Sequence, residues 1–495
     1  MNTLKLLFCA VFLLPPFQIH ADVNDHLQSI RNSPNALYNF FLQMPKGGEL
    51  HYHLAGGAYP ESMLKIAKQQ DYCINLPEFS LSLTSSPCTG FKTPQLEQHP
   101  ELYLQTLKSW SLKEFIPGKE TAHDHFFNSF YKFGPLVSAH RPELVAEVIR
   151  QAVRQQELYL ELMILPDNAQ STQFASIINK ANTLDKKLKL LLDNQQFQEN
   201  IKHTVTESNH ILTKARQLLD CKSHPQQSAC LIQVNFLYYT LREQPLDAVF
   251  AQTLNAFAAV YRSQLHHGAL VGVNLVQAED GPIALKDYHK HMEIFQFLHQ
   301  RYPQIPISLH AGELTLDLAP PKDLSFHIAD AINYGQAQRI GHGVDIAFEQ
   351  NAESTLTNMA KNEKAVEINL TSNRKLLHVY GKKHPLTYYL AHNVPVVLST
   401  DDEGILRTDL SSQYVAAVIE HHLDYTAIKQ INRNALTYAF LKGKSLWQDS
   451  HYAQPVPECQ KLDSITCQEF LSNNPKAQLQ AQLEIKLQQF ERQFN

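Results

Sequence analysis

Metal-binding side chains occur at four separate places in the chain, and each place closes a short run of apolar residues. The first is His51-Tyr52-His53, where both imidazoles point to one side of a strand because alternate residues share a face. The others read His-Ala-Gly-Glu at 310–313, Gly-His-Gly at 341–343 and Thr-Asp-Asp at 400–402. Three imidazoles and one carboxylate suit Zn²⁺, with Fe²⁺, Mn²⁺ or Co²⁺ as alternatives. The predicted ligands of one divalent ion are His51, His53, His310 and Asp401.

Each of these residues also has an ordinary structural explanation. A single histidine in a strand is more often hydrogen-bonded within the core than bound to a metal. An Asp-Asp pair is usually a solvated turn or a helix cap, and a His-x-His pair alone is weak evidence for a metal site. Isolated buried histidines and aspartates are costly without partners. The metal interpretation therefore depends on all four places meeting at one point.

Eight short apolar runs alternate with segments of helical spacing, which predicts a parallel sheet. The runs are 49–54, 158–164, 231–237, 270–276, 305–310, 338–341, 365–370 and 394–399. Eight such units favour closure into a (β/α)₈ TIM barrel, in which active sites lie at the carboxyl ends of the strands. The metal-type residues end the first, fifth, sixth and eighth runs. An open doubly wound sheet is the alternative, but no glycine-rich phosphate turn follows the first run.

The N-terminal residues 1–21 have the pattern of a signal peptide. Lys5 precedes an apolar run at 6–14 that is too short to span a bilayer as an ordinary helix, and Ala21 is a small residue suited to cleavage. A buried N-terminal helix is the alternative. We therefore expect an exported protein without a membrane helix after cleavage, periplasmic if the source is Gram-negative and otherwise secreted.

Six of the seven cysteines follow residue 21, and an even number in an exported chain predicts disulfides. Many pairings are possible, but the short separations favour Cys73–Cys88, Cys221–Cys230 and Cys459–Cys467. A metal site is the alternative, although the chain contains no Cys-x-x-Cys.

Residues 22–495 are predicted to form a single barrel domain with insertions near 66–105 and 168–230 and with extra helices at both ends. The first insertion is rich in Ser, Thr and Pro and predicts a loop, whereas the second is largely helical in pattern. The polar segment 476–495 predicts a helix that packs on the barrel. The balance of 43 basic and 48 acidic residues argues against a nucleic-acid binder.

At these motifs the sequence resembles the adenosine deaminase family of metal-dependent amidohydrolases. The resemblance covers most of the chain after residue 21. It includes MPKGGELHYHLAGG (44–57), FYKFGPLV (130–137), LYLELMIL (158–165), ISLHAGE (307–313), QRIGHG (338–343) and VVLSTDDEG (396–404). The cysteines, the export signal and MPKGG further resemble the secreted, growth-factor-related branch. The resemblance implies one Zn²⁺ per chain and hydrolysis of adenosine, and of 2′-deoxyadenosine, to inosine and ammonia.

The resemblance also implies a role for each site residue. The four ligands hold the metal, and a water activated by the metal attacks purine C6. Glu313 protonates N1, so its carboxyl must carry a proton when substrate binds, for which a dry pocket is the usual means. His342 orients the water and helps to deprotonate it. Asp402 meets N7 of the base as an acceptor.

Three positions, Ala55, Gln277 and Glu403, depart from the family pattern, and one nearby carboxylate, Glu279, has no definite role. Ala55 stands where an Asp usually meets the ribose 5′-hydroxyl, which leaves selectivity at that position open. Gln277 stands at the position of a Gly whose N–H meets purine N3. Glu279 is a candidate pocket residue or a surface carboxylate. Glu403 follows Asp402 in place of a Pro and is expected to face the substrate mouth or to cap a helix.

Two other functions stay open. One is deamination of a related aminopurine, such as 5′-methylthioadenosine or adenine. The other is a secreted binding or signalling protein on the same scaffold, although a scaffold needs none of the metal-type residues. The cytidine-deaminase type of site is excluded, because its signature H-x-E…P-C-x-x-C is absent. The oligomeric state is open.

Overall fold

The computed structural model describes residues 22–70, 72–83, 87–451 and 453–494. The predicted signal peptide at 1–21 lies outside the described residues. Of the helices within these ranges, none is both long enough and apolar enough to cross a membrane.

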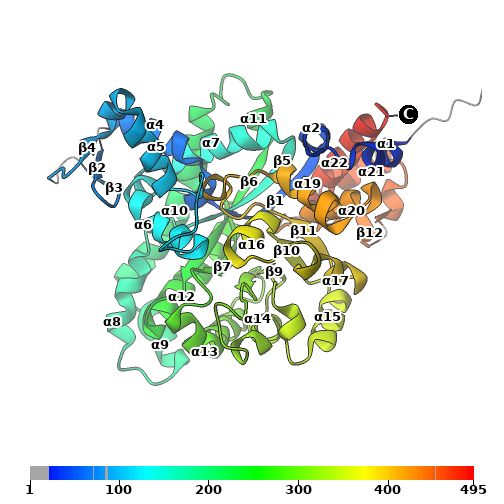
Figure 1. The fold of residues 1–495 in the computed structure, drawn as a ribbon. Helices are drawn as coiled ribbons and strands as arrows, with labels where there is room; N and C mark the ends of the chain where they lie inside the picture. Colours follow the sequence, from blue (N-terminus) through cyan, green and yellow to red (C-terminus); the bar gives the residue numbers. More distant parts are fainter. Residues whose placement is uncertain (1–21, 71, 84–86, 452, 495) are drawn as a thin grey trace, which may run out of the picture.

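Eight parallel strands form the centre of the molecule (Figure 1). They lie in two four-stranded sheets with the orders β1-β5-β6-β7 and β11-β10-β9-β8. Their bounds are Lys46–His53 (β1), Glu157–Ile164 (β5), Gln233–Leu241 (β6), Leu270–Val276 (β7), Ser308–Ala311 (β8), Arg339–His342 (β9), Ala365–Ile368 (β10) and Val396–Leu398 (β11). The predicted runs coincide with these strands, with differences of a few residues at the ends.

Two parallel bridges join the sheets into a (β/α)₈ barrel. One pairs Tyr52 with Asp401, and the other pairs Val273 with Ile307. At the first bridge the His53 amide donates to the carbonyl of Asp401 at 3.0 Å, and the Asp401 amide donates to the carbonyl of His51 at 3.1 Å. The closure of the barrel therefore fixes Asp401 beside the strand that carries the two histidines.

Helices connect successive strands and cover the outside of the barrel (Figure 1). The strands are buried on both faces, which explains why their sequences are nearly continuous apolar runs. The connecting helices are α7 (Arg141–Arg154), α12 (Leu246–Leu265), α13 (Pro282–His299), α14 (His327–Asn333), α15 (Ala352–Lys361), α17 (Leu386–Ala391), α19 (Leu410–His421) and α20 (Tyr425–Thr437). Three short helices follow strands directly at their carboxyl ends: α3 (Leu54–Gly57), α16 (Leu370–Leu377) and α18 (Glu403–Leu406).

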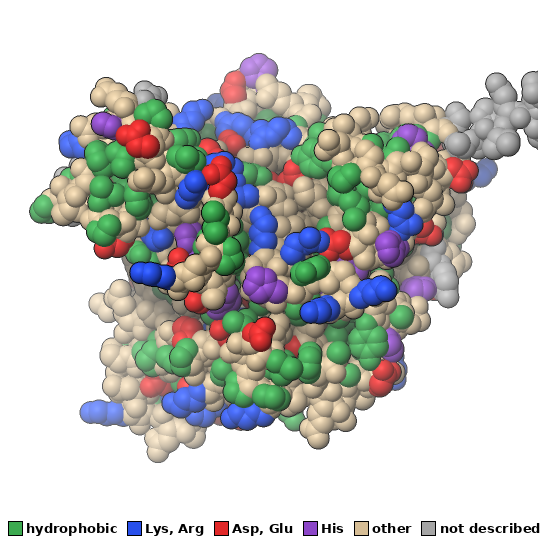
Figure 2. Space-filling view, in the orientation of Figure 1, with side chains coloured by type: hydrophobic (Ala, Val, Ile, Leu, Met, Phe, Trp, Pro, Cys, Tyr) green, Lys and Arg blue, Asp and Glu red, His purple; other side chains and the backbone are tan. Residues whose placement is uncertain are grey.

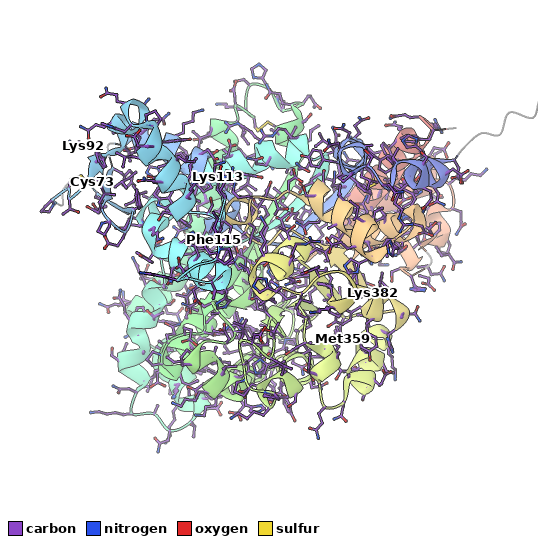
Figure 3. All side chains as sticks on the ribbon, in the orientation of Figure 1. Cys73, Lys92, Lys113, Phe115, Met359 and Lys382 are labelled. Atoms are coloured by element: carbon purple, nitrogen blue, oxygen red, sulfur yellow. A yellow bond between two sulfur atoms is a disulfide. The ribbon has the colours of Figure 1, made fainter. Side chains whose placement is uncertain are left out.

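The first insertion contains a small sheet that the sequence did not predict. Strands β2 (Cys73–Asn75), β3 (Ser80–Ser82) and β4 (Phe91–Lys92) pair antiparallel in the order β3-β2-β4. The sheet lies at the edge of the molecule, where Figure 3 shows Cys73 and Lys92 together. Strands of two or three mostly polar residues carry too little alternation to be recognised in a sequence. Helices α4 (Pro60–Gln69), α5 (Pro100–Ser109) and α6 (Ala122–Ala139) flank the sheet.

The second insertion is helical, as predicted. It contains α8 (Ala175–Ile178), α9 (Leu184–Leu192), α10 (Gln195–Leu218) and α11 (Ser228–Leu231). The three predicted disulfides are present, and their Cα atoms lie 5.6 Å apart in Cys73–Cys88, 5.4 Å in Cys221–Cys230 and 4.5 Å in Cys459–Cys467. Each closes a short local loop.

The two ends of the described chain pack together on the barrel (Figure 1). The start of the chain forms α1 (Val23–Ile30) and α2 (Pro34–Gln43). The end forms a hairpin of β12 (Trp447–Asp449) and β13 (Gln454–Pro455), followed by α21 (Ile465–Ser472) and α22 (Pro475–Glu491). The ring of Phe40 in α2 meets the ring of Phe490 in α22 with centroids 5.1 Å apart. The apolar stripe predicted for the last helix is buried: Leu479, Leu483, Leu487 and Phe490.

Candidate active site

Three histidine ring nitrogens and a carboxylate oxygen meet at the carboxyl end of the barrel. Nε2 of His53 lies 3.1 Å from Nε2 of His310. Oδ1 of Asp401 lies 3.3 Å from Nε2 of His51 and 3.3 Å from Nε2 of His53. All four ligand atoms lie within 4.8 Å of one another. The structure therefore brings together the four residues that the sequence predicts as ligands.

This donor set fits a small divalent cation. Zn–N bonds of about 2 Å in a tetrahedral site place the ligand atoms about 3.3 Å apart, which agrees with the separations above. Among the described residues, the buried Nε2 of His51 has no hydrogen-bond partner. Nε2 of His53 and Nε2 of His310 face each other across the same space. A cation would satisfy all of these nitrogens at once.

Buried partners hold the opposite ring nitrogen of two ligands. Nδ1 of His51 lies 2.7 Å from Oε2 of Glu367, and Nδ1 of His310 lies 2.8 Å from Oδ1 of Asn274. Such partners fix the tautomer and leave Nε2 free to bind a metal. Sequence reasoning missed both residues. The available signal was a single polar residue inside each otherwise apolar strand, AVEI and LVGVNLV.

Burial and nearby charges set the protonation of the ligands. Burial lowers the pKa of His53 to about 4 and holds the pKa of His310 well below its usual value. Burial also disfavours the charged form of His51, but the neighbouring carboxylates of Asp401 and Glu367 outweigh it and raise the pKa of His51 to about 9.

Glu313 lies beside the four ligands with its carboxyl in a dry environment. Its side chain is only 9% exposed, and its Oε1 lies 3.5 Å from Nδ1 of His342. Glu313, His342 and Asp401 form a second group with ligand atoms within 4.8 Å of one another. Burial, followed by the charges of Asp401 and Glu279, raises the pKa of Glu313 to about 8. The carboxyl therefore keeps its proton at neutral pH and can act as an acid.

His342 and Asp401 sit on strained backbone, with φ of 68° and 69°. Residues other than glycine adopt such angles rarely, and they concentrate at functional sites. Burial lowers the pKa of His342 to about 3, so its ring is neutral. Nδ1 of His342 lies 3.1 Å from the side-chain nitrogen of Asn373, a contact that the sequence did not suggest.

Asp402 packs against the Gly-Gly turn of α3. A Cβ atom on Gly56 would lie 2.0 Å from Oδ1 of Asp402, so only glycine leaves room for this carboxyl. Oδ1 is buried without a hydrogen-bond partner among the described residues. Burial and the neighbouring charge of Asp401 raise the pKa of Asp402 well above its usual value.

A cavity of about 390 Å³ connects these groups. Its polar side is formed by His53, His310, Glu313, His342, Asp401 and Asp402. Its apolar side is formed chiefly by Ala55, Phe126, Phe127, Phe130, Tyr239 and Leu241. The cavity thus combines a cation site, an acid and an aromatic wall contributed by α6.

The residues predicted to contact substrate fall into two groups. Ala55 and Gln277 line the cavity. Gln277 has φ of 83°, the conformation that suits the glycine usual at this position, and its side chain turns aside to accept the Glu243 amide at 2.9 Å.

Glu279 and Glu403 do not line the cavity. This corrects the expectation of a pocket or surface position for Glu279, whereas Glu403 takes the second of its two expected places, the start of a helix. Glu279 is 1% exposed and accepts the backbone amides of Gly312 at 3.0 Å and Glu313 at 2.7 Å. Burial would raise the pKa of Glu279, but the hydrogen bond and charge of His327 lower it to about 2. Glu403 is buried at the start of α18 and accepts the Tyr52 hydroxyl at 2.9 Å. Contacts with residues far away in the sequence determine where both carboxyl groups lie, so the sequence alone does not reveal their positions.

Sequence comparisons identify relatives of this chain. A family model described as adenosine deaminase matches residues 111–446. The adenosine deaminase of Pectobacterium atrosepticum is 32% identical over 136 residues, which are 27% of this chain and 37% of that protein. The adenosine deaminase of Escherichia coli strain SMS-3-5 / SECEC is 30% identical over 199 residues, 40% of this chain and 53% of that protein. The chain thus spans 37% and 53% of the length of these two relatives.

Structure comparisons find the same fold in several solved structures. Arabidopsis ADAL in complex with IMP has a TM-score of 0.55 at 16% identity, and the match covers 91% of this chain and 99% of the ADAL chain. Adenine deaminase from Arthrobacter aurescens has a TM-score of 0.51 at 16% identity, with coverage of 80% and 94%. An amidohydrolase from Burkholderia ambifaria with bound Zn has a TM-score of 0.51 at 14% identity, with coverage of 90% and 94%. The family model covers more than half of the sequence, and the chain belongs to the adenosine deaminase family.

Proposed function

We propose that this protein is a zinc-dependent deaminase that hydrolyses adenosine, and 2′-deoxyadenosine, to inosine and ammonia. One observation carries the proposal: the buried carboxyl of Glu313, whose pKa is raised by its surroundings, lies beside a four-ligand cation site in one cavity. Deamination at purine C6 requires an acid for ring N1 and an activated water for C6. Membership of the adenosine deaminase family supports the same chemistry.

His51, His53, His310 and Asp401 would hold the ion. When bound, such an ion lowers the pKa of water to about 7 and so supplies hydroxide near neutral pH. Three nitrogens and one carboxylate suit zinc, and zinc is the metal in the similarly folded amidohydrolase from Burkholderia ambifaria.

Glu313 gives its proton to N1 of the purine, which withdraws electrons from C6 and makes that carbon electrophilic. His342 is neutral, so a ring nitrogen can accept a proton from the water that adds to C6. The tetrahedral carbon then expels the amino group as ammonia with the proton that His342 accepted. As C6 becomes a carbonyl, its hydroxyl proton returns to Glu313. N7 of adenine carries a lone pair and no hydrogen, so a carboxyl that meets it must act as a donor and not as the acceptor expected from the sequence. Burial and the charge of Asp401 raise the pKa of Asp402, which favours the protonated form that this role requires.

The cavity favours an uncharged nucleoside over a nucleotide. Among the described lining residues there is no Lys or Arg, whereas Glu243, Glu313, Asp401 and Asp402 all bring carboxyl groups. A phosphate would lack the charged donors that it usually finds in a binding site. On the face shown in Figure 2, basic and acidic side chains are interspersed, so no broad positive surface is visible there to attract a nucleotide.

A second candidate substrate is 5′-methylthioadenosine. Ala55 and the phenylalanines of α6 give the cavity an apolar side, and that side suits an uncharged, apolar 5′ group. Ala55 also lacks the carboxylate that would bind a 5′-hydroxyl.

The test is a substrate panel with the purified mature protein, followed by loss of the adenine absorbance. The panel holds adenosine, 2′-deoxyadenosine, 5′-methylthioadenosine, adenine and AMP. We expect the highest kcat/KM for adenosine. The value for AMP should be lower by about 100-fold or more, because the phosphate would lose about two charge-assisted hydrogen bonds without replacement in the cavity. Turnover of 5′-methylthioadenosine without turnover of adenosine would replace the proposed substrate. No turnover of any compound by the metal-loaded protein would favour a binding protein.

We also propose that the protein is exported, with cleavage after Ala21. The disulfides support this, because disulfides persist in oxidising compartments. N-terminal sequencing of the protein from its native host should start at Asp22. A cytoplasmic chain that still starts at Met1 would contradict the proposal.

A further inference from the structure

Glu279 lies behind the wall of the cavity, in the connection between β7 and α13. Among the described residues, its side-chain hydrogen bonds go to the backbone that carries the proposed acid and to His327. Its Oε1 accepts the amide of Gly312 at 3.0 Å, and its Oε2 accepts the amide of Glu313 at 2.7 Å. Both carboxylate oxygens are therefore committed to one short segment of backbone.

We propose that Glu279 is a positioning residue for the deamination: its carboxylate holds the backbone of Glu313 so that the Glu313 carboxyl points into the cavity. This inference rests on the proposed function, in which Glu313 is the acid. It assigns Glu279 a role different from the substrate contact predicted from the sequence.

The segment around Glu313 needs such an anchor. Strand β8 ends at Ala311, and the next regular element is the 3₁₀ turn at Asp323–Ser325, so the amides of Gly312 and Glu313 have no strand partner. The carbonyls of the segment are bound from the other side, where Gly343 donates to Ala311 at 3.1 Å. Glu279 supplies the missing acceptors and completes a clamp that holds the segment from both sides.

Glu279 is itself held rigidly. Nδ1 of His327 donates to its Oε1 at 2.6 Å. The His327 ring stacks on Tyr288 with centroids 3.6 Å apart and planes 9° apart, and the Tyr288 hydroxyl donates to the His327 carbonyl at 2.8 Å. The orientation of the Glu279 carboxylate is therefore fixed by the ring of His327, which is itself held by Tyr288.

Glu349 provides a matched control. It is also a buried carboxyl, 6% exposed, and it accepts two backbone amides, from Ile328 at 2.6 Å and Ala329 at 3.2 Å. Its partners are in α14, and it makes no hydrogen bond to Gly312 or Glu313. Both amides are accepted by Oε1, so Glu349→Gln can keep both bonds and tests only the exchange of a buried carboxyl for an amide. Glu279→Gln must in addition lose one acceptor for the segment of the acid.

The first measurement is steady-state kinetics of the zinc-loaded Glu279→Gln and Glu349→Gln proteins. A glutamine has one acceptor oxygen, so whichever way its amide turns, one of the two amides of the segment loses its partner. We expect Glu279→Gln to lower kcat by about 10- to 100-fold, because small displacements of a catalytic group have effects of this size. KM for adenosine and the zinc content should stay close to wild type, and Glu349→Gln should retain kcat within about threefold.

The second measurement is hydrogen exchange of peptides that contain Gly312 and Glu313, which needs no activity. Exchange should accelerate about tenfold or more in Glu279→Gln, the scale of one lost hydrogen bond to a charged group, and not in Glu349→Gln. Wild-type kcat together with wild-type exchange in Glu279→Gln would overturn the inference, as would equal losses in both variants or a loss confined to KM. If wild-type protein turns over no adenosine, the proposed function fails, and the exchange result still decides whether Glu279 holds this backbone.

Discussion

Single residues set the chemistry of this site through their surroundings. Glu313 has an ordinary carboxyl, yet burial next to Asp401 and Glu279 raises its pKa to about 8. The sequence identified Glu313 from its place in His-Ala-Gly-Glu. It could not identify Glu367 or Asn274, because their roles arise from contacts with His51 and His310 on other strands.

Replacing Glu313 by Gln removes the transferable proton and keeps the size of the side chain. We expect kcat/KM for adenosine to fall by about 1,000-fold, within the range of general acid catalysis. Steady-state kinetics check this expectation, and thermal unfolding and zinc content should match wild type. A Glu313→Gln protein with full activity would refute the role of the acid.

The raised pKa of Glu313 predicts how activity changes with pH. The protonated form is the active acid, and a raised pKa keeps that form populated to higher pH. We therefore expect kcat/KM to decline as the pH rises through about 8, by about tenfold per pH unit beyond it. A kcat/KM profile recorded from pH 6 to pH 10 checks this. Activity that increases through pH 8 would mean that the ionised carboxyl is the active form.

At the scale of elements, the carboxyl ends of the strands position the site, and close backbone approaches constrain it. The strand containing both histidines runs into the Gly-Gly turn of α3, and Asp402 fills the space above that turn. The apolar runs and their order predicted these strands well. The small sheet of the first insertion was not predicted, since its short polar strands are defined by pairing and by the Cys73–Cys88 disulfide.

Gly56→Ala should impair the site, because the new Cβ would lie 2.0 Å from Oδ1 of Asp402. We expect kcat/KM to fall about 100-fold as Asp402 is displaced from the base. Gly134→Ala in α6 is the control, since its Cβ would meet nothing within 4 Å. The kinetics of the two variants are compared under identical conditions. Equal activity of both variants would show that the approach of Asp402 to the turn is unimportant.

Asn274→Ala should weaken metal binding without removing a ligand. His310 loses the partner that orients its ring, and losses of this kind cost about 10- to 100-fold in metal affinity. Zinc affinity is measured by competition with a chelator. Asn434→Ala is the control, because Asn434 is also buried but donates to the Val396 carbonyl at the start of β11. Unchanged affinity in Asn274→Ala would remove Asn274 from the metal site.

At the scale of the whole molecule, closure of the barrel is what joins distant sequence segments into one site. The bridge between Tyr52 and Asp401 places ligands about 350 positions apart in the chain side by side. Periodicity and strand order were sufficient to predict that the four motifs share one end of the barrel. They could not predict which carboxyls face the cavity, because Glu279 and Glu403 differ from Glu313 only in what packs around them.

The central claim is that His51, His53, His310 and Asp401 share one ion that is required for deamination. The most direct measurement is titration of metal-free protein with Zn²⁺ while bound metal and adenosine turnover are followed on the same sample. We expect no turnover without metal, a linear rise in activity, and a plateau at one zinc per chain. Full turnover in metal-free protein, or saturation of the site with zinc without any turnover, would contradict the account.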